Sequence, residues 1–502
     1  MATLNALLKK VNVTKTNLDT LELECTGLCV NSLRCTEGDV FICITGERLD
    51  GHDFICTAVQ RGASIIVCEK VTKWLEEHSE VRYVAVENTR LAAAYMYNEL
   101  CGCPTERLML VAVTGTNGKT STTYFLREIF KCAGYTTGVI GTVRCLIGEE
   151  EAVLSDSSAS GVNSMTTPSP EHLYPMLKRM ADAGVEIVFM EASSHSLSQY
   201  RLDPIRFIAG VFTGLTQDHL DYHSSMEEYY LAKRRLFSLC STAVINADGV
   251  YSRRLYDEII TPAVTYSAEG RHADFAARDV FADALGDVSY TLCDAYGSEH
   301  ISCPISGSFM VTNTLAAASV ARLFGIKKEI IAAALEICPQ IPGRMERVSL
   351  PDGCDFDVFI DYAHTPDALE RVLRSLLALK KPSGRLVVVF GCGGDRDKTK
   401  RPIMGRIATE LANLTVITGD NSRTENPRAI ICDILRGAAE GADCKVIERR
   451  EKAIRWVIEN HRPDDIILLA GKGHEDYEID ADGKRPFSEK DIIMQSVISF
   501  AK

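Results

Sequence analysis

The chain has 502 residues, of which 46% are hydrophobic and 25% are charged. This composition excludes a chain that is mainly disordered, because the apolar residues suffice for a buried core, and at about 150 residues per domain the length predicts about three domains. The net charge of −13 argues against a protein that binds nucleic acid through a broad basic face.

The N-terminal region, residues 1–106, is predicted to be a small α/β domain. Apolar runs at 40–45 and 63–68 are typical of short strands, and the pattern at 90–100 is typical of a helix. A glycine and a proline interrupt residues 101–105, so we expect a linker there.

The central region, residues 107–340, opens with an apolar strand at 108–113, a glycine-rich turn and a helical pattern at 120–132. Further buried strands are predicted at 186–190, 207–212 and 243–246. Because continuous apolar runs alternate with helices, we expect a parallel sheet with helices on both faces.

The C-terminal region, residues 341–502, shows the same alternation. Its predicted strands lie at 358–360, 386–390, 414–418 and 466–470, and a helix is predicted at 366–380. We therefore expect a second α/β unit with a doubly wound, Rossmann-like sheet.

The segment 111–120 reads Val-Ala-Val-Thr-Gly-Thr-Asn-Gly-Lys-Thr and carries a phosphate-loop pattern. Two glycines bracket a tight turn between strand and helix, so backbone N–H groups and the helix N-terminus point at a phosphate. Lys119 can reach the terminal phosphates, and the Thr120 hydroxyl can join a Mg²⁺ shell. The spacing differs from the common P-loop, because Val113 stands where that pattern has its first glycine.

Polar side chains follow two of the predicted central strands. Glu191 follows the strand at 186–190, and the segment 218–223 comes soon after the next strand. Both lie at carboxyl ends of strands, where open α/β sheets bind their ligands. Glu191 and Thr120 are candidate Mg²⁺ ligands, because this ion prefers oxygen donors.

The Gly-Thr-Asn-Gly-Lys-Thr loop after an apolar strand resembles the ATP loop of the Mur ligase family, ATP-dependent amide-forming enzymes that build the peptide of bacterial peptidoglycan. Folylpolyglutamate and cyanophycin synthetases share much of the pattern. The resemblance implies three domains, with a central P-loop-type parallel sheet domain and a C-terminal Rossmann-like domain, and ATP and Mg²⁺ as cofactors. It implies that ATP binds Gly115, Thr116, Asn117, Gly118, Lys119, Thr120, Ser121, Asn313, Arg344, Asp361 and His364.

The same resemblance implies a catalytic group. Glu191 in Glu-Ala-Ser-Ser-His and His219 in Asp-His-Leu-Asp match residues that serve the metal sites, together with Thr120. Lys233 matches a lysine that reacts with CO₂ to form a carbamate, an anion that can hold Mg²⁺. With Lys119, these residues are the expected catalytic and metal-binding set.

A sugar-nucleotide substrate, UDP-MurNAc-dipeptide, is also implied. The matching positions are Val30, Ser32, Thr166, Thr167, Ser193, Gln199 and Arg201. Hydroxyl, amide and guanidinium groups suit a polyanionic substrate that carries a sugar. The chain departs from the family at Asn31 and Leu33, in place of Asp and Arg, and at Met165, where many relatives have Asn.

Three loops that follow predicted C-terminal strands are expected to bind the incoming amino acid. The residues are Arg396, Asp420, Asn421, Ser422, Arg423, Gly471 and Glu475. Two arginines and one glutamate suit a distal group that carries both a carboxylate and an ammonium. Relatives that add meso-diaminopimelate carry Asp-Asn-Pro-Arg; here Arg423 is kept and Ser422 replaces the proline. We therefore favour meso-diaminopimelate, with L-lysine or another diamino acid as the alternative.

The resemblance implies that ATP activates the D-Glu carboxylate of UDP-MurNAc-L-Ala-D-Glu as an acyl phosphate, which the diamino acid attacks, with closure of the C-terminal region over the cleft. One alternative is a folylpolyglutamate-type ligase, which the uridine-like N-terminal pattern and the Asp-Asn-Ser-Arg loop disfavour. Another is a non-catalytic nucleotide-binding sensor, which has no need of Lys119, Glu191, His219 and Lys233 together.

The expected setting is the cytoplasm, and we expect a monomer. No segment approaches 18 uninterrupted apolar residues, so no membrane span is predicted. The N-terminus lacks the apolar stretch of a secretory signal. Eighteen cysteines are scattered with no Cys-x-x-Cys pair, which predicts reduced core residues rather than disulfides or a zinc site.

Overall fold

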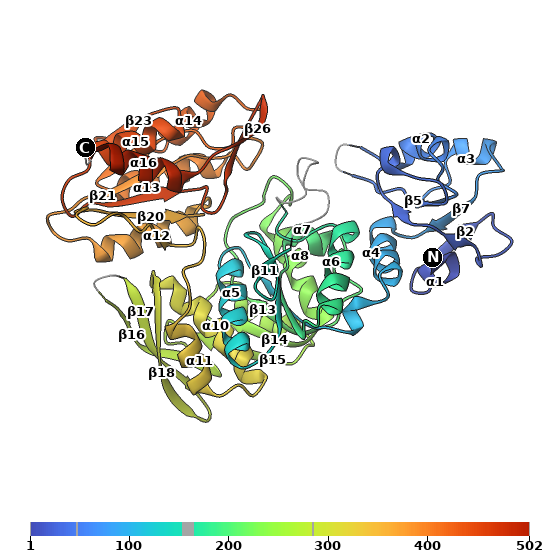
Figure 1. The fold of residues 1–502 in the computed structure, drawn as a ribbon, viewed down its shortest axis with the longest axis horizontal. Helices are drawn as coiled ribbons and strands as arrows, with labels where there is room; N and C mark the ends of the chain where they lie inside the picture. Colours follow the sequence, from blue (N-terminus) through green and yellow to red (C-terminus); the bar gives the residue numbers. More distant parts are fainter. Residues whose placement is uncertain (1, 47–48, 153–164, 284–285, 501–502) are drawn as a thin grey trace.

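The computed structural model describes residues 2–46, 49–152, 165–283 and 286–500. Three α/β units lie in a row, with the N-terminal unit at one end and the C-terminal unit at the other (Figure 1). The central unit carries the largest sheet, and both neighbours contact it. This arrangement confirms the three-part α/β architecture expected from the sequence.

The N-terminal unit contains a five-stranded sheet. Its order is β2 (Val13–Thr16), β7 (Tyr83–Val86), β6 (Ile65–Cys68), β5 (Val40–Ile42) and β4 (Leu28–Cys29), flanked by α2 (Ile55–Gln60), α3 (Lys73–Glu77) and α4 (Thr89–Leu100). The predicted helix is confirmed as α4. It begins at Thr89 because the Asn88 side chain caps it, with Oδ1 accepting the Leu91 N–H at 2.9 Å.

The centre of the middle sheet is parallel, as predicted. The strands in spatial order are β9 (Thr137–Ile140), β12 (Ile187–Glu191), β8 (Met109–Thr114), β13 (Phe207–Phe212), β14 (Cys240–Asn246), β15 (Ala263–Ser267) and β16 (Phe275–Ala282). These neighbours pair in parallel registers. Because their carboxyl ends share one edge, the residues that follow β8, β12 and β13 meet there.

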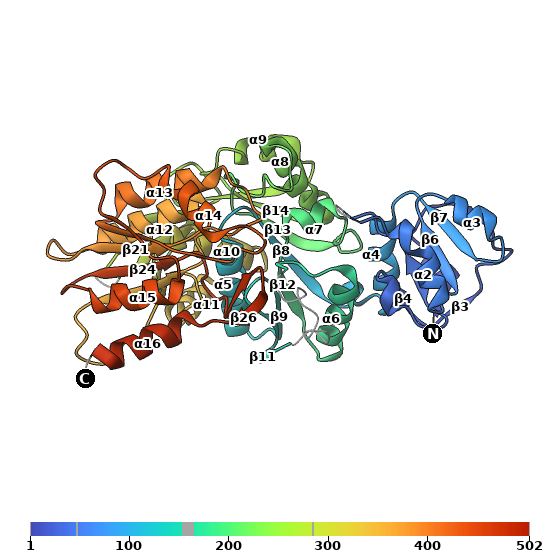
Figure 2. The same ribbon diagram turned by 90° about the horizontal axis from the view of Figure 1, so that it is seen from above.

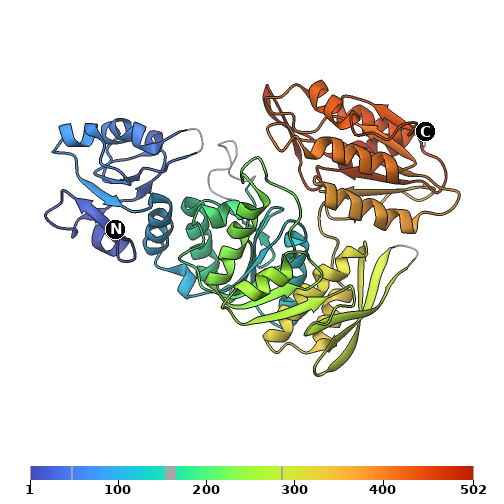
Figure 3. The same ribbon diagram turned by 180° about the vertical axis from the view of Figure 1, so that it is seen from behind.

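The central sheet also carries antiparallel strands at both ends, which the sequence did not predict. At one end β9 pairs antiparallel with β10 (Cys145–Ile147), which pairs with β11 (Glu150–Glu151). At the other end β16, β17 (Asp287–Asp294) and β18 (Gly297–Ser306) form an antiparallel extension that reaches beneath the C-terminal unit (Figure 3). Along β17, Val288, Tyr290 and Leu292 are buried at every second position, the pattern of a strand with only one buried face.

Helices cover both faces of the central sheet. Two hydrophobic cores lie on opposite faces of the sheet, and successive residues of β8 point alternately into one and the other. On one face, Val111 and Val113 pack with α5 (Lys119–Cys132), α10 (Phe309–Leu323) and α11 (Lys328–Glu336). Leu110 and Ala112 pack with the core that contains α4, α6 (Pro170–Asp182), α7 (Ser194–Ser198) and α8 (Met226–Arg234). The short α9 (Ser252–Glu258) follows β14.

The C-terminal unit is a six-stranded, mostly parallel sheet. Its order is β19 (Glu346–Arg347), β20 (Asp357–Asp361), β24 (Ile466–Ala470), β21 (Leu386–Phe390), β22 (Leu414–Ile417) and β23 (Cys444–Val446). Helices α12 (Pro366–Leu379), α13 (Lys400–Leu411) and α14 (Pro427–Leu435) lie on one face, and α15 (Arg450–Glu459) and α16 (Glu489–Phe500) lie on the other (Figure 2). The doubly wound prediction is confirmed, with β21 and β24 correct to the residue.

All 18 cysteines are free thiols, as predicted. Within the described residues, no helix combines the length and the apolar composition needed to cross a bilayer.

Candidate active site

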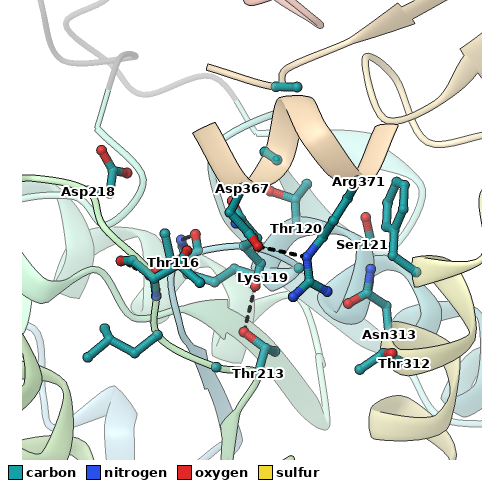
Figure 4. A pocket seen from close by; sticks show the side chains of 18 of the residues that line it. Thr116, Lys119, Thr120, Ser121, Thr213, Asp218, Thr312, Asn313, Asp367 and Arg371 are labelled. Atoms are coloured by element: carbon teal, nitrogen blue, oxygen red, sulfur yellow. Dashed lines mark hydrogen bonds and ion pairs between the residues drawn. The ribbon is translucent and has the colours of Figure 1, made fainter. Parts of the chain in front are cut away.

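A cavity of about 320 Å³ opens where the central and C-terminal units meet. Its walls come from the phosphate loop, the ends of β12 and β13, helix α10, the connecting segment at Arg344 and helix α12. Figure 4 shows α12 above the loop, with Asp367 and Arg371 directed toward Lys119 and Thr120. Ten of the eleven residues predicted to bind ATP line this cavity. The exception is Gly115, which precedes Thr116 in the same loop.

The two loop glycines are required by close neighbours. Gly118 has φ +86°, and a Cβ there would lie 2.4 Å from Asn313 Oδ1. Gly115 has φ +148°, and a Cβ there would lie 1.9 Å from Thr213 Oγ1. The loop therefore packs tightly on β13 and α10, which fixes its N–H groups at the cavity edge.

Lys119 lies at the end of this loop. Its Nζ donates to the carbonyls of Gly115 and Thr116 at 3.0 and 2.8 Å. Burial lowers the pKa of Lys119, although the carboxylates of Glu191 and Asp218 oppose the shift. Anionic phosphate oxygens in the cavity would favour its charged form, so the site is built for an anion.

Thr120 connects three parts of the cavity. Its hydroxyl donates to Glu191 Oε1 at 2.9 Å and accepts from Arg344 Nη2 at 3.1 Å. Glu191, only 1% exposed, also accepts the Thr142 backbone N–H at 2.8 Å and the Thr142 hydroxyl at 3.0 Å. A buried carboxylate held by three donors has a fixed orientation, with the cavity beside it.

Lys233 approaches the same loop from α8. It is 1% exposed, and its Nζ donates to the Gly115 carbonyl at 2.8 Å. Burial holds the pKa of Lys233 well below its ordinary value, and the nearby Lys119 cation lowers it further. Burial therefore favours the neutral, nucleophilic form of this amine.

Histidines gather next to Asp218. His219 Nε2 lies 3.3 Å from Asp218 Oδ2, and His364 Nε2 lies 3.9 Å from the same oxygen. Burial lowers the pKa of His219 to about 3 and that of His364 to about 4. Both rings are neutral near pH 7, the form in which imidazole accepts a hydrogen bond or binds a metal. His364, predicted to bind ATP, lies on this side of the cavity.

Five of the predicted sugar-nucleotide residues form one hydrogen-bonded group in the central unit. Thr167 Oγ1 donates to the Glu191 carbonyl at 2.7 Å and lies 3.2 Å from Ser193 Oγ. Arg201 donates to the Thr167 carbonyl at 2.7 Å and to Gln199 Oε1 at 2.6 Å. Thr166 joins the group through Thr142, with 3.0 Å between their hydroxyls.

The other two predicted sugar-nucleotide residues belong to the N-terminal unit. Val30 lies just before the turn Ser32–Arg34, and Ser32 is the first residue of this turn. A substrate that touches both sets of residues must therefore bridge two units. At the departing positions, Asn31 caps this turn through a 3.0 Å bond from the Leu33 N–H, and Leu33 is 62% exposed. Met165 lies against Arg201, whose Nη1 is 3.5 Å from the methionine sulfur.

The three amino-acid loops converge, as their positions after β21, β22 and β24 require. Asn421 Nδ2 donates to Glu475 Oε2 at 2.8 Å, and its backbone carbonyl accepts the Gly394 N–H at 2.9 Å. Arg423, with φ +51°, donates to the Gly394 carbonyl at 2.8 Å. Arg396 is exposed on the same loop as Gly394.

Sequence reasoning overlooked several residues. Thr142 orients Glu191, and Asp367 accepts from Asn117 Nδ2 at 2.8 Å across the two units. Asp367 could have been noticed, because it follows Thr365-Pro366 at the start of a predicted helix. Lys472 stands inside the Gly-Lys-Gly-His-Glu segment that was singled out for Gly471 and Glu475.

Family models match most of the chain, and known proteins match nearly its whole length. The models are "Mur ligase family, catalytic domain" over residues 24–98, "Mur ligase middle domain" over 113–321 and "Mur ligase, glutamate ligase domain" over 343–473. The chain is 39% identical over 477 residues to UDP-N-acetylmuramoyl-L-alanyl-D-glutamate--2,6-diaminopimelate ligase 1 of Clostridium acetobutylicum, covering 95% of each protein. It is 40% identical over 478 residues to the corresponding ligase of Geobacillus kaustophilus, covering 93% of this chain and 94% of that protein.

Solved structures agree. A UDP-N-acetylmuramoyl-L-alanyl-D-glutamate--2,6-diaminopimelate ligase superposes with a TM-score of 0.69 at 27% identity, over 100% of this chain and 99% of that one. Folylpolyglutamate synthase of Mycobacterium tuberculosis superposes with a TM-score of 0.59 at 18% identity, over 82% of this chain and 95% of that one, which is a similarity of fold alone.

Proposed function

The chain belongs to the Mur ligase family, and we propose that it joins 2,6-diaminopimelate to the D-Glu carboxylate of UDP-N-acetylmuramoyl-L-alanyl-D-glutamate with the use of ATP. It is an amide-forming ligase of peptidoglycan precursor synthesis. One observation carries the proposal. The hydroxyl of Thr120, which follows the phosphate loop, hydrogen-bonds both the buried Glu191 carboxylate and the Arg344 guanidinium of the connecting segment, and all three residues line one cavity.

We propose two chemical steps. A carboxylate does not couple to an amine at neutral pH, because oxide is a poor leaving group. A D-Glu carboxylate oxygen attacks the γ-phosphorus of ATP, ADP leaves, and an acyl phosphate forms. The amine then attacks the carbonyl carbon, loses a proton and expels inorganic phosphate. Lys119, Arg344 and the loop N–H groups stabilise the negative charge on the transferring phosphoryl group.

Mg²⁺ fits the donor set beside the loop. The Thr120 hydroxyl and the Glu191 carboxylate are oxygen donors 2.9 Å apart, and Mg²⁺ usually binds one or two carboxylates plus substrate phosphates. Among the residues with described positions, no three His, Cys, Asp or Glu side chains are grouped to hold a metal ion by themselves. This agrees with a cation that depends on the nucleotide, with the neutral His219 ring as a further ligand. The bound cation would neutralise phosphate charge.

We propose that Lys233 is carbamylated. A neutral amine adds to the carbon of CO₂ and releases a proton, which gives a carbamate anion. The low pKa of Lys233 supplies the neutral amine. The product would place negative charge near Lys119, so it would convert a buried amine into a metal-binding oxygen donor.

The diamino acid is proposed to bind at the loops after β21, β22 and β24. Arg396 and Arg423 would receive its distal carboxylate, and Glu475, which Asn421 holds in place, would receive its distal ammonium. Asp420, Ser422 and Gly471 complete this site. L-Lysine lacks the distal carboxylate and would leave the two arginines without a partner, which favours diaminopimelate.

Residues 1–106, 107–340 and 341–502 are proposed as the three domains of a monomer. The matches to three family models fall inside these ranges. In this arrangement Val30 and Ser32 hold the uridine end of the substrate, while Thr166, Thr167, Ser193, Gln199 and Arg201 hold its sugar and peptide near Glu191.

The direct test is a phosphate-release assay with ATP, Mg²⁺ and UDP-MurNAc-L-Ala-D-Glu, with meso-diaminopimelate or L-lysine added separately. Diaminopimelate should stimulate phosphate release and yield the tripeptide product by mass spectrometry. Arg423→Ala should reduce kcat/KM for diaminopimelate by about 100-fold, because the distal carboxylate of the substrate loses its charged partner in the site. The KM for ATP should stay unchanged. A wild-type protein that no diamino acid stimulates would refute the proposed function.

A further inference from the structure

Lys472 is a fully buried cation beneath the amino-acid loops. It follows β24, and its side chain is 0% exposed. Its Nζ donates to the Tyr477 carbonyl at 2.6 Å and to Asn421 Oδ1 at 3.1 Å. It also lies 3.5 Å from Glu475 Oε2 and 3.6 Å from Asp420 Oδ1. Four oxygens from three loop segments therefore surround one ammonium group.

The contacts of Lys472 fix the orientation of two proposed substrate-binding groups. Asn421 Oδ1 accepts from Lys472 and from the Ile479 N–H at 3.0 Å, so its Nδ2 must point the other way, where it donates to Glu475 at 2.8 Å. Glu475 Oε2 is held by Asn421 and Lys472 together, and the Tyr477 side chain also hydrogen-bonds this carboxylate. The amide cannot flip without losing both of these oxygen contacts.

Lys472 also determines the charge of this site. Asp420 is packed against Gly471, where a Cβ would lie 2.9 Å from Asp420 Oδ2. The carboxylates of Asp420 and Glu475 lie 3.6 and 3.5 Å from the buried Lys472 ammonium group. Burial and Asp420 raise the pKa of Glu475, whereas Lys472 lowers it. The Lys472 cation thus opposes the rise in the pKa of Glu475 that burial and the second carboxylate cause.

We propose that Lys472 is a positioning residue of the amino-acid site, which orients Asn421 and Glu475 and offsets the charge of Asp420, so that Glu475 can receive the distal ammonium of the diamino acid. This inference rests on the proposed function. Lys472 itself does not touch the substrate, because its side chain is enclosed. The alternative is that Lys472 only stabilises the fold, as other buried ion pairs do.

The two roles differ in the effect of pH on substrate binding. Glu475 faces Asp420, Lys472, Arg423, Tyr362 and Tyr477, and His474 and Asp476 adjoin it in the chain. Across an adjoining cavity the charged groups are Arg144, Glu151, Glu346, Lys484, Glu489 and Lys490. Removing Lys472 takes away the only one of these cations that lies within 4 Å of Glu475 among the described residues. The pKa of Glu475 should therefore rise, and the ionised fraction of Glu475 should become larger as the pH increases.

The experiment measures the KM for meso-diaminopimelate from about pH 7 to about pH 9 in full-length wild type, Lys472→Met and Lys472→Met/Asp420→Asn. For Lys472→Met, the KM at pH 7 should rise by about tenfold or more and fall as the pH rises, with kcat and the KM for ATP within about threefold of wild type. In the double variant, loss of Asp420 removes the neighbouring carboxylate that raises the pKa of Glu475, so the pH dependence of the KM should recover toward that of wild type, whatever pH-independent change in KM the loss of Asp420 itself causes. If Lys472→Met fails to fold, the double variant is compared with Asp420→Asn, and the same pH profile in both would contradict the proposed role.

Arg385→Met is the matched control. Arg385 pairs with the fully buried Asp465 at 2.6 Å, at the amino ends of the same strands and far from the three loops. It should lower the melting temperature without changing the KM for diaminopimelate. If Lys472→Met behaves like Arg385→Met, or if the double variant shows no recovery, the proposed role of Lys472 is wrong. An inactive wild type would instead refute the proposed function and this inference with it.

Discussion

Arg344 donates from Nη2 to the Thr120 hydroxyl at 3.1 Å, and these two residues are 224 positions apart in the sequence. Arg344 belongs to the segment that connects the central and C-terminal units, whereas Thr120 opens the helix after the phosphate loop. The same arginine stacks over the Tyr362 ring, with its guanidinium carbon 4.6 Å from the ring centroid. The position of the C-terminal unit is therefore coupled to the nucleotide end of the cavity.

Arg344→Ala should lower kcat/KM for ATP by about 100-fold or more, because a preorganised cation facing the phosphates is lost. Arg344→Lys keeps the charge without the planar fork and the stacking on Tyr362, so we expect a loss of about tenfold. Steady-state kinetics with saturating acceptor and amino acid give both values. Arg347→Ala is the control, since Arg347 is three residues away and pairs with Asp357 outside the cavity. Equal losses in the Ala and Lys variants would contradict the electrostatic role, because lysine keeps the positive charge.

Gly118→Ala should weaken ATP binding more than its backbone conformation alone explains. A positive φ costs an alanine about 1 kcal/mol, and here the added Cβ also lies 2.4 Å from Asn313 Oδ1. Gly184→Ala is the matched control, because Gly184 has φ +77° and nothing lies within 4 Å of the added carbon. Calorimetric ATP titration should show an affinity loss of about tenfold or more for Gly118→Ala and none for Gly184→Ala. Similar affinities in the two variants would show that the Asn313 contact is unimportant.

Much of this site could be predicted from the chain, for a physical reason. The strands at Phe207–Phe212, Leu386–Phe390 and Ile466–Ala470 are correct to the residue, because strands buried on both faces are continuous apolar runs. Polar residues end or follow such strands, so Glu191 and Asn421 were predicted as site residues from their position. Their mutual proximity follows from strand order.

The strand β17 and the roles of Thr142 and Lys472 were not predicted, because they depend on contacts between residues that are far apart in the sequence. β17 is buried on one side only, and its alternating residues were not distinguished from a loop. Thr142 binds Glu191 from a turn 49 residues away, and Lys472 binds Asn421 from 51 residues away. A threonine in a turn and a lysine between two glycines have no residue pattern that predicts these partners.

Lys233→Ala should reduce kcat by about 100-fold or more, because it removes the proposed carbamate and its metal-binding oxygen. For wild type, exhaustive removal of CO₂ and bicarbonate should lower activity, and added bicarbonate should restore it. Labelled ¹³C-bicarbonate should give a carbamate carbon signal in wild type that is absent from Lys233→Ala. The variant also serves as the control, since its residual activity should not respond to bicarbonate. Wild-type activity that is indifferent to CO₂, with no carbamate signal, would contradict the modification.

Asp361 gives a prediction for stability as a function of pH. It is 5% exposed, and burial raises its pKa from the ordinary 3.8 to about 6, although Arg344 and backbone N–H groups oppose the shift. A raised carboxyl pKa means that the native state holds the proton longer than the unfolded state does. The buried carboxyl therefore costs no stability below pH 3.8, and its cost grows until it is complete above about pH 6.

Asp361→Asn removes this titration and keeps an oxygen that can accept the Met345 N–H, which Asp361 Oδ2 now accepts at 2.7 Å. Relative to wild type, the variant should gain about 1–3 kcal/mol of unfolding free energy as the pH rises from about 4 to about 7. Denaturant unfolding of both proteins at several pH values measures this difference. Because all other groups are shared, their titrations cancel in the comparison. A difference in unfolding free energy that is constant over this range, or that shrinks with rising pH, would show that burial does not raise the pKa of Asp361.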